Sequence, residues 1–335
     1  MENFRIAVIG LGSVAQLVHL PILKKMPGVS VVAAAELNKN RLKTVSDKYN
    51  ISGAYTDYRQ MLDEAEVDAV IIATPTSSHT EIAKEVISRK INLLIEKPIA
   101  RTYREAKEVV DLAQKNKVTM MVGMNMRYRP DIMLLKSIAN SGEIGELFYV
   151  KAGWLKKQSS ESKWFTDKEK SGGGVIIDLG IVLLDVSLWL LDFPSIRAVS
   201  TQNFSHFTNS VEDTSISKIR CNNNSLIFLE SSWSIGSDRD SLYFDIYGSK
   251  GNASINPFRV FKRSGGTMVD MTPFKSEAEI TLFKKSYQNE IKHFIGACKG
   301  LNPNLSPGNE SLSRMRIIET MYQSNSEKKE IELKS

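Results

Sequence analysis

Arg5-Ile-Ala-Val-Ile-Gly10-Leu-Gly12-Ser-Val-Ala15 joins a short apolar run to a glycine-rich turn near the start of the chain. The run is rich in Ile and Val, which predicts a buried parallel strand. Gly10 allows a tight turn, Gly12 lets the backbone approach a pyrophosphate, and Ala15 lets a helix pack closely on the strand. The following helix, through about Lys25, presents free N–H groups and a positive dipole end to phosphates.

Apolar runs and amphipathic helices alternate after this turn. Further strands are predicted at 29–36, 67–74, 91–96 and 118–124, and helices at 39–49, 78–89 and 103–115. Strands alternating with helices form a doubly wound parallel sheet with right-handed crossovers. We therefore predict an α/β fold that begins with a Rossmann dinucleotide-binding domain over residues 1–124.

Glu36 ends the second predicted strand, 24 residues after Gly12. An acid there accepts hydrogen bonds from the adenosine ribose hydroxyls and repels a 2′-phosphate. The sequence thus predicts NAD as the cofactor and disfavours NADP, although Arg41 can soften that discrimination. The alternative is a surface glutamate that only ends a strand. The predicted cofactor contacts are Gly10, Leu11, Gly12, Ser13, Val14, Glu36, Thr74, Pro75, His79, Glu96 and Lys97.

The pattern changes after Met124. Strand-like runs are predicted at 147–154, 198–204, 214–220, 225–233, 241–247, 252–255, 258–263 and 330–333, and helices at 131–140, 176–191, 282–299 and 309–324. The turns at 221–224 and 248–251 suit antiparallel pairing. Residues 125–335 are therefore predicted to form a second α/β domain with a largely antiparallel sheet.

Composition narrows the function classes. The 335 residues carry 44 basic and 38 acidic side chains, intermixed, so the net charge of +6 does not suggest a nucleic-acid-binding face. Cys221 and Cys298 have no Cys-x-x-Cys spacing, and no cluster of His, Cys, Asp and Glu has metal-ligand spacing. We expect neither a redox cysteine pair nor a metal site.

Membrane attachment is not predicted either. The N-terminus lacks the pattern of a signal peptide, because its apolar run is only four residues long before the glycine turn. The apolar stretch 175–191 contains Asp178 and Asp185 and reads as too short and too charged to span a bilayer comfortably. We expect a cytoplasmic protein without membrane or nucleic-acid partners.

Glu96-Lys97-Pro98 ends the predicted strand at 91–96. Ligands bind at the carboxyl ends of parallel strands, where Lys97 can hydrogen-bond a substrate hydroxyl. Lys97 can accept that hydroxyl's proton when burial and a positive neighbour, such as the oxidised nicotinamide ring, disfavour its charged form. Pro98 can aim the lysine, through a cis bond if one is present. The alternative is a surface lysine before a turn.

Asp178 follows Gly172-Gly-Gly174 at the start of a predicted helix. It is predicted to pair with Lys97 or orient a substrate hydroxyl, and equally to cap the helix start. Val182 and Asp185, four and seven residues on, are predicted to share its helix face. Asp185 lies on so apolar a face that a structural hydrogen-bonding role is favoured.

Histidine and aromatic positions have open interpretations. His19 is predicted to be a packing residue with satisfied hydrogen bonds, and His79 either lines the nicotinamide pocket or serves the helix start. Trp154, Trp164 and Tyr128 can stack on a ring or a sugar face, with core packing as the default. Arg127 and Arg129 either hold an anionic substrate group or lie at the solvated surface.

Several of these motifs occur together in one known family. They are the glycine turn at 10–15, Ala73-Thr-Pro75 with His79, Glu96-Lys97-Pro98, Gly123-Met-Asn-Met-Arg127-Tyr, and Gly172-Gly-Gly174 with Asp178 and Gly180. With them the chain resembles, along almost its whole length, the Gfo/Idh/MocA oxidoreductases, which include glucose–fructose oxidoreductase and inositol dehydrogenases. The tripeptide at 96–98 in that setting is the specific part of the resemblance.

The resemblance implies a Rossmann domain followed by an α/β domain with a largely antiparallel open sheet. That sheet often forms the subunit interface, so a homodimer or homotetramer is expected. NAD or NADP is implied as cofactor, and sugars, polyols, inositols or nucleotide sugars as substrates. The family's catalytic lysine corresponds to Lys97 and its aspartate to Asp178. Substrate contacts are expected from Lys97, Asn125, Arg127, Tyr128, Trp154, Trp164, Asp178 and Val182.

The chain departs from the family pattern at one position. After the glycines the family usually has Asp-x-Gly-x-His, and this chain has Val182 in place of the histidine. Lys97 then does the acid–base work with Asp178 and water, or another side chain substitutes, or redox activity is lost. We favour a dehydrogenase that transfers hydride between nicotinamide and a hydroxyl-bearing carbon. The alternatives are a non-redox enzyme that uses bound NAD transiently, and a non-catalytic NAD(H)-binding protein.

Overall fold

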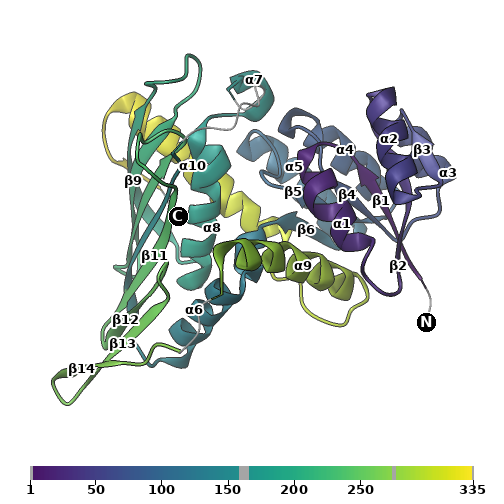
Figure 1. Cartoon of the computed structure of the whole chain (residues 1–335). Helices are drawn as coiled ribbons and strands as arrows, with labels where there is room; N and C mark the ends of the chain where they lie inside the picture. The colour runs from purple at the N-terminus through teal and green to yellow at the C-terminus, as the bar shows by residue number, and fades with distance from the viewer. Residues whose placement is uncertain (1–2, 158–165, 274–276, 334–335) are drawn as a thin grey trace. The chain divides into compact units, whose positions relative to one another are not determined.

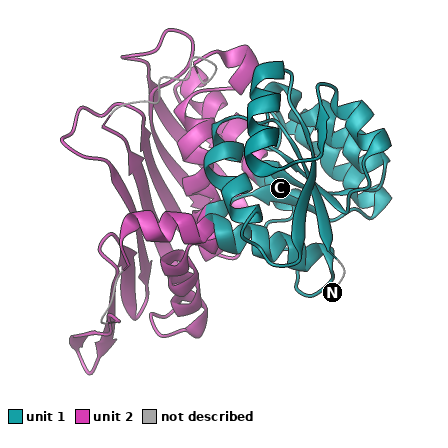
Figure 2. Cartoon of the chain, turned by 45° about the vertical axis from the view of Figure 1, so that its right-hand side comes forward, with its two compact units in different colours: residues 1–125, 287–313 teal, residues 126–286, 314–335 magenta. Residues whose placement is uncertain are grey.

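The computed structural model describes residues 3–157, 166–273 and 277–333, and the chain divides into two compact units (Figure 2). Unit 1 comprises Met1–Asn125 with Tyr287–Ser313, and unit 2 comprises Met126–Ser286 with Arg314–Ser335. The predicted cut at 124/125 lies one residue before the first division. The segment 287–313 was predicted to lie in the second domain, but it belongs to unit 1. It contacts the Rossmann sheet, where the Ser306 hydroxyl donates to the Val122 carbonyl at 2.8 Å.

Six parallel strands form the sheet of unit 1, in the order β3-β2-β1-β4-β5-β6. They are β1 Phe4–Ile9, β2 Val29–Ala35, β3 Gly53–Tyr55, β4 Ala69–Ile72, β5 Asn92–Glu96 and β6 Met120–Gly123. Strands β1 and β4 are buried almost throughout, as expected for central strands of a sheet covered on both faces. The prediction of a doubly wound parallel sheet is confirmed.

Short helices connect these strands (Figure 1). They are η1 Ala15–His19, α1 Leu20–Leu23, α2 Lys39–Tyr49, α3 Tyr58–Glu64, α4 Thr76–Ser88 and α5 Tyr103–Asn116. Asn38 caps α2 and Thr102 caps α5, each through a side-chain oxygen that accepts a backbone N–H. The segment η1 is a π-helical turn, a rare form that occurs often at functional sites.

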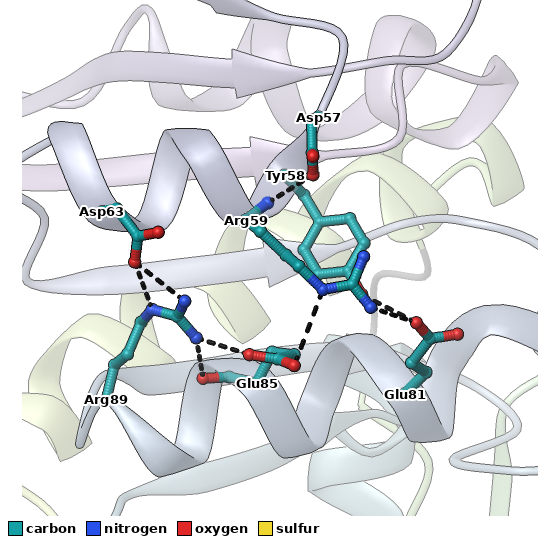
Figure 3. Close-up of polar contacts among 7 residues, drawn as sticks. All are labelled: Asp57, Tyr58, Arg59, Asp63, Glu81, Glu85 and Arg89. Carbon is teal, nitrogen blue, oxygen red and sulfur yellow. Dashed lines mark hydrogen bonds and ion pairs between the residues drawn. The ribbon is translucent and has the colours of Figure 1, made fainter.

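Exposed ion pairs join α3 to α4 (Figure 3). Arg59 pairs with Glu81 and lies 3.6 Å from Glu85. Arg89 contacts Glu85 at 2.6 Å and Asp63 at 2.8 Å. Exposed pairs of this kind contribute about 0–1 kcal/mol each, so the network orients the two helices more than it stabilises the unit.

Nine strands form the sheet of unit 2, in the order β14-β13-β12-β11-β7-β10-β9-β8-β15. They are β7 Leu147–Leu155, β8 Ile196–Phe204, β9 Thr214–Cys221, β10 Leu226–Ser232, β11 Ser241–Gly248, β12 Gly251–Ile255, β13 Arg259–Ser264, β14 Thr267–Asp270 and β15 Ile331–Glu332. Among the described strand pairs of this second sheet, only β7–β10 is parallel. The predicted largely antiparallel sheet is confirmed.

The helices of unit 2 include η2 Asn125–Tyr128, which begins in unit 1, then α6 Pro130–Ser141, α7 Lys168–Ser171, η3 Ile176–Gly180 and α8 Ile181–Leu190. Helix α8 packs against β7 and β10, and α6 packs against β12. The helices α9 Glu279–Cys298 and α10 Gly308–Glu327 each continue from one unit into the other.

The helical run Lys168–Leu190 is long and apolar enough to cross a membrane, contrary to the expectation for 175–191. This run is longer than 175–191 because it includes the short helix α7, which residues 172–174 separate from η3. However, 89% of its apolar window is buried inside the protein. This is the burial of a core helix, and α8 fills that role against the sheet of unit 2.

Candidate active site

The glycine turn has the backbone that the sequence predicted. Gly10 has φ +90°, and a Cβ there would lie 2.6 Å from the Ala73 carbonyl oxygen, so only glycine fits. A Cβ on Gly12 would meet nothing within 4 Å. Gly10 is therefore required by the protein's own packing. Gly12, in contrast, borders open space in unit 1 where a ligand's phosphates have room.

Glu36 lies at this turn rather than apart from it. Its carboxylate accepts the Leu11 N–H at 3.0 Å and the Asn38 N–H at 2.9 Å, and Arg41 lies 3.2 Å away. The side chain is only 10% exposed. The alternative of an ordinary surface glutamate is thus wrong, because Glu36 joins the ends of β1 and β2.

The other predicted cofactor contacts of unit 1 flank the same sheet edge. Ser13 and Val14 are exposed directly after the turn. Thr74 and Pro75 follow β4, and the Ser78 hydroxyl donates to Thr74 Oγ1 at 2.8 Å. The carboxyl ends of β1, β2 and β4 therefore carry the residues that the Rossmann pattern assigns to a dinucleotide.

His79 is buried and links two loops. Its Nδ1 lies 2.8 Å from the Pro98 carbonyl oxygen, and its Nε2 lies 2.9 Å from that of Thr74. Burial lowers the pKa of His79. Of the two open interpretations, the structure favours a positioning role, because both ring nitrogens face carbonyls of the loops after β4 and β5.

Lys97 lies at the end of β5, and its bond to Pro98 is cis, as the sequence suggested. The preceding Glu96 faces His19, with 2.8 Å between Glu96 Oε1 and His19 Nε2. Burial alone would raise the pKa of Glu96, but the hydrogen bond from His19 and the charges of His19, Lys97 and His79 hold it below its usual value. A buried carboxylate is therefore kept ionised beside Lys97.

The prediction that His19 is a packing residue with satisfied hydrogen bonds is confirmed only in part. It is fully buried and packs edge-on against Tyr287. However, its Nδ1 has no hydrogen-bond partner within the described part of the chain, so the expectation of a satisfied histidine is wrong for that atom. The sequence offered no signal for the contact with Glu96, because 77 residues separate the two.

Arg127 and Arg129 are both 1% exposed, so their interpretation as solvated surface residues is wrong. Arg127 makes two hydrogen bonds to the Asp185 carboxylate, at 2.8 and 2.6 Å, and Arg314 adds a third at 2.6 Å. The structural role predicted for Asp185 is confirmed. Burial opposes the charge of Arg129, but its bonds to Asp131 and Glu279 raise its pKa.

The remaining predicted substrate residues differ in exposure. Tyr128 is 1% exposed and Val182 is 4% exposed, so both are core residues, while Asn125 is 9% exposed. Trp154 is partly buried against an apolar cluster of Val175, Leu179, Val211 and Trp233. Core packing is confirmed for Tyr128, while Trp154 is only partly buried and its stacking role stays a prediction. Trp164 lies outside the described residues.

Asp178 lies in the π-helical turn η3. Its Oδ2 accepts the indole N–H of Trp233 at 2.9 Å. A π turn advances differently from an α-helix, so the regular spacing that placed Asp178 and Asp185 on one face does not continue through it. The two aspartates accordingly bond to different partners.

The helix start before Asp178 is held by a residue that the sequence analysis missed. Glu212 Oε1 accepts the N–H groups of Gly174 and Ile176, each at 3.0 Å, and the Tyr322 hydroxyl at 2.9 Å. Asp178 is the acidic residue of the first turn of η3, as considered, while Glu212 accepts the N–H groups at this helix start. No local pattern identified Glu212, because 38 residues separate it from Gly174.

Each of the two units holds some of the candidate functional residues in place. Unit 1 brings the glycine turn and Glu36 to the carboxyl ends of parallel strands, where Lys97 also lies, and unit 2 holds Asp178 in a fixed turn. The glycine turn and Glu36 fit a dinucleotide. Within the described ranges, no three His, Cys, Asp or Glu side chains are grouped to hold a metal ion.

Comparison with known proteins agrees with this geometry. The model of an oxidoreductase family with an NAD-binding Rossmann fold matches residues 4–124. The model of that family's C-terminal alpha/beta domain matches residues 136–333.

Curated relatives match over nearly their full length. D-glucoside 3-dehydrogenase of Escherichia coli (strain K12) is 24% identical, over 96% of this chain and 95% of that protein. Rhizopine catabolism protein MocA of Rhizobium meliloti is 25% identical, over 95% of this chain and 94% of that protein.

Solved structures show the same fold. Levoglucosan dehydrogenase in complex with NADH and levoglucosan has a TM-score of 0.88 and 19% identity, with all of both chains covered. GenD2 from gentamicin A biosynthesis in complex with NAD also has a TM-score of 0.88, at 21% identity, and covers 100% of this chain and 97% of that one. The two family models, which together span most of the sequence, establish that the chain belongs to the Gfo/Idh/MocA family of oxidoreductases.

Proposed function

We propose that this oxidoreductase is an NAD-dependent dehydrogenase of sugars, polyols or nucleotide sugars. It transfers a hydride between nicotinamide and a carbon that alternates between hydroxyl and carbonyl. The observation that carries the proposal is the glycine turn. Ala73 leaves no room for a side chain at Gly10, while Gly12 faces open space and Glu36 accepts the N–H of Leu11 between them. The comparisons support the oxidoreductase class, and the substrate class goes beyond them.

The cofactor is held by the ends of β1, β2 and β4. The backbone at Gly12 approaches the pyrophosphate, and the helical turns after it direct N–H groups and a positive dipole end at the phosphates. Glu36 receives the adenosine ribose hydroxyls. Nicotinamide, when bound, supplies the carbon that accepts or returns the hydride.

Lys97 handles the hydroxyl proton of the substrate. The cis bond to Pro98 and the contact of His79 with the Pro98 carbonyl define the course of the loop that carries it. A protonated Lys97 can donate to a carbonyl oxygen in the reductive direction. Asp178 is the second group proposed to orient a substrate hydroxyl, and Val182 stands where the family usually has a histidine as proton carrier.

Sugars are supported as the substrate class by the names of relatives. D-glucoside 3-dehydrogenase and levoglucosan dehydrogenase both carry sugar substrates in their names. Both are oxidoreductases of similar sequence. A screen of glucosides, anhydrosugars, inositols and nucleotide sugars therefore covers the proposal.

NAD is favoured over NADP because Glu36 would repel a 2′-phosphate. The test is a titration with NADH and NADPH, followed by nicotinamide fluorescence. We expect NADH to bind at least about ten times more tightly, and Glu36→Ala to reduce that ratio, since about 1.4 kcal/mol corresponds to a tenfold change. Equal affinity in the unsubstituted protein contradicts the cofactor preference, and no binding of either contradicts the proposed function.

Turnover then tests the catalytic assignment. Lys97→Ala and Asp178→Asn are expected to lose about 10²–10⁴-fold in kcat on the substrate found in the screen. Near-normal kcat in both variants overturns the assignment. A protein that copurifies with NAD and converts substrate without net NADH is instead the non-redox alternative.

A further inference from the structure

Glu212 is a buried acid that the proposed chemistry leaves without a role. It is 7% exposed and lies just before β9. A single oxygen of its carboxylate accepts three hydrogen bonds, from Gly174, Ile176 and Tyr322. A buried acid with this many donors is costly to remove, so its arrangement constrains the backbone that supplies those donors.

The backbone of Glu212 holds the same segment a second time. Its carbonyl oxygen accepts the Val175 N–H at 2.9 Å. A Cβ on Gly174 would lie 2.0 Å from that carbonyl, and a Cβ on Gly173 would lie 2.0 Å from the Tyr322 hydroxyl. The glycines are therefore needed for this contact within unit 2, which accounts for two members of the triple-glycine motif.

The next residue fixes the partner of Asp178. The Asp213 carbonyl accepts the backbone N–H of Trp233 at 2.9 Å, and the Trp233 indole N–H donates to Asp178 at 2.9 Å. Val211 packs with Val175, Leu179 and Trp233 in one apolar cluster. The segment 211–213 thus contacts both the helix start that carries Asp178 and the side chain that bonds to it.

We propose that Glu212 is the positioning residue of Asp178. It fastens the first N–H groups of the π-helical turn and so sets where the Asp178 carboxylate lies, while Asp213 places the indole that bonds to it. Glu212 acts through Asp178 and does not touch the substrate. This inference rests on the proposed function for its catalytic consequence, but its structural part stands on the contacts within unit 2.

A spectroscopic experiment tests the structural part without any substrate. The protein has four tryptophans, so ¹⁵N labelling of the indoles gives four N–H signals, and Trp233→Phe identifies the one from Trp233. We expect Glu212→Ala to move that signal in the direction produced by Asp178→Ala. An unchanged signal in Glu212→Ala overturns the proposal.

Conservative variants separate positioning from general destabilisation. Glutamine has the same shape as glutamate and an oxygen that can accept the same three bonds, so Glu212→Gln is expected to keep the Trp233 signal. The matched control is Ile246→Val, a buried change in β11 that should leave the signal in place. If Glu212→Ala does not fold, Glu212→Asp replaces it, because it withdraws the carboxylate by one methylene, and the same shift is expected.

A double-mutant cycle tests the catalytic consequence. We expect Glu212→Ala to lower kcat at least tenfold with the NADH dissociation constant unchanged, and Glu212→Gln to retain kcat. In the Asp178→Asn background, Glu212→Ala should have little further effect, because both changes act through one carboxylate. Effects that multiply independently overturn the proposal. If Asp178→Asn itself retains normal kcat, the proposed function fails at that residue, while the Trp233 signal still decides the positioning role.

Discussion

At the scale of single residues, the packing of the protein requires a glycine at one position of the glycine turn and not at the other. Gly10 is needed by the protein itself, because its positive φ and the Ala73 carbonyl exclude a side chain. Gly12 has open space where its side chain would be. A residue that packing does not require, in a motif that binds dinucleotides, is best explained by the ligand.

Gly12→Ala is therefore expected to weaken NADH binding at least tenfold while leaving the free energy of unfolding within about 0.5 kcal/mol of the original. The added methyl occupies the approach of the pyrophosphate and touches nothing in the protein. NADH titration and thermal unfolding measure the two quantities. Gly10→Ala is the contrasting variant and should lose stability. Unchanged NADH affinity in Gly12→Ala would place the phosphates elsewhere.

At the scale of elements, the predicted helices and strands agree with the structure where their periodicity is long. Helix α2 has the predicted bounds of Lys39–Tyr49. The sequence missed β3, α3 and β14, which have three, seven and four residues, because so few positions do not establish a period. It also missed both π-helical turns, since an extra residue in a turn has no signature in the hydrophobic pattern.

Helix α8 depends on a buried ion cluster. Asp185 is 1% exposed and lies between Arg127 and Arg314, whose side chains are fully buried. We expect Asp185→Ala to lower the free energy of unfolding by about 3–5 kcal/mol, because it leaves two buried guanidinium groups without this carboxylate. Urea unfolding measures the loss.

The control for this prediction is another ion pair of the same unit. Asp192 pairs with Lys136, and its side chain is 79% exposed. Asp192→Ala should therefore cost only about 0–1 kcal/mol. If both variants lose the same small amount, the cluster around Asp185 does not stabilise α8 as we infer.

At the scale of the whole molecule, the two faces of the unit 2 sheet differ in what covers them, and the end of α10 lies beside Ile216. Helices α6 and α8 pack against this sheet, and residues such as Ile219 and Ile246 on the covered face are buried. The opposite face carries Ile216, which is 40% exposed, and the stacked pair of Tyr149 and Tyr247. Aromatic and aliphatic groups of this kind are enriched in subunit interfaces.

We propose that this face joins two copies of the chain in a homodimer or homotetramer. Ile216→Lys is then expected to raise the dissociation constant of the oligomer at least tenfold, because it adds a positive charge to a hollow already lined by Lys218, Lys328 and Lys329. Sedimentation velocity over a range of concentrations measures it. Leu301→Lys, at a 77% exposed position in unit 1, is the control and should leave the oligomer intact. A monomer at all concentrations would contradict the proposal.

The sequence by itself determined the fold class, the glycine turn and the positions of Glu36, Lys97 and Asp178 at element ends. These follow from local rules, because hydrophobic periodicity and glycine spacing act over a few residues. Only the tertiary structure decided which partners those residues have. The contacts of His19 with Glu96, of Glu212 with Gly174 and of Arg314 with Asp185 span 77, 38 and 129 residues. A buried charged or polar group needs a partner, and tertiary folding brings that partner close in space. Because the two are far apart along the chain, no local sequence pattern identifies the partner.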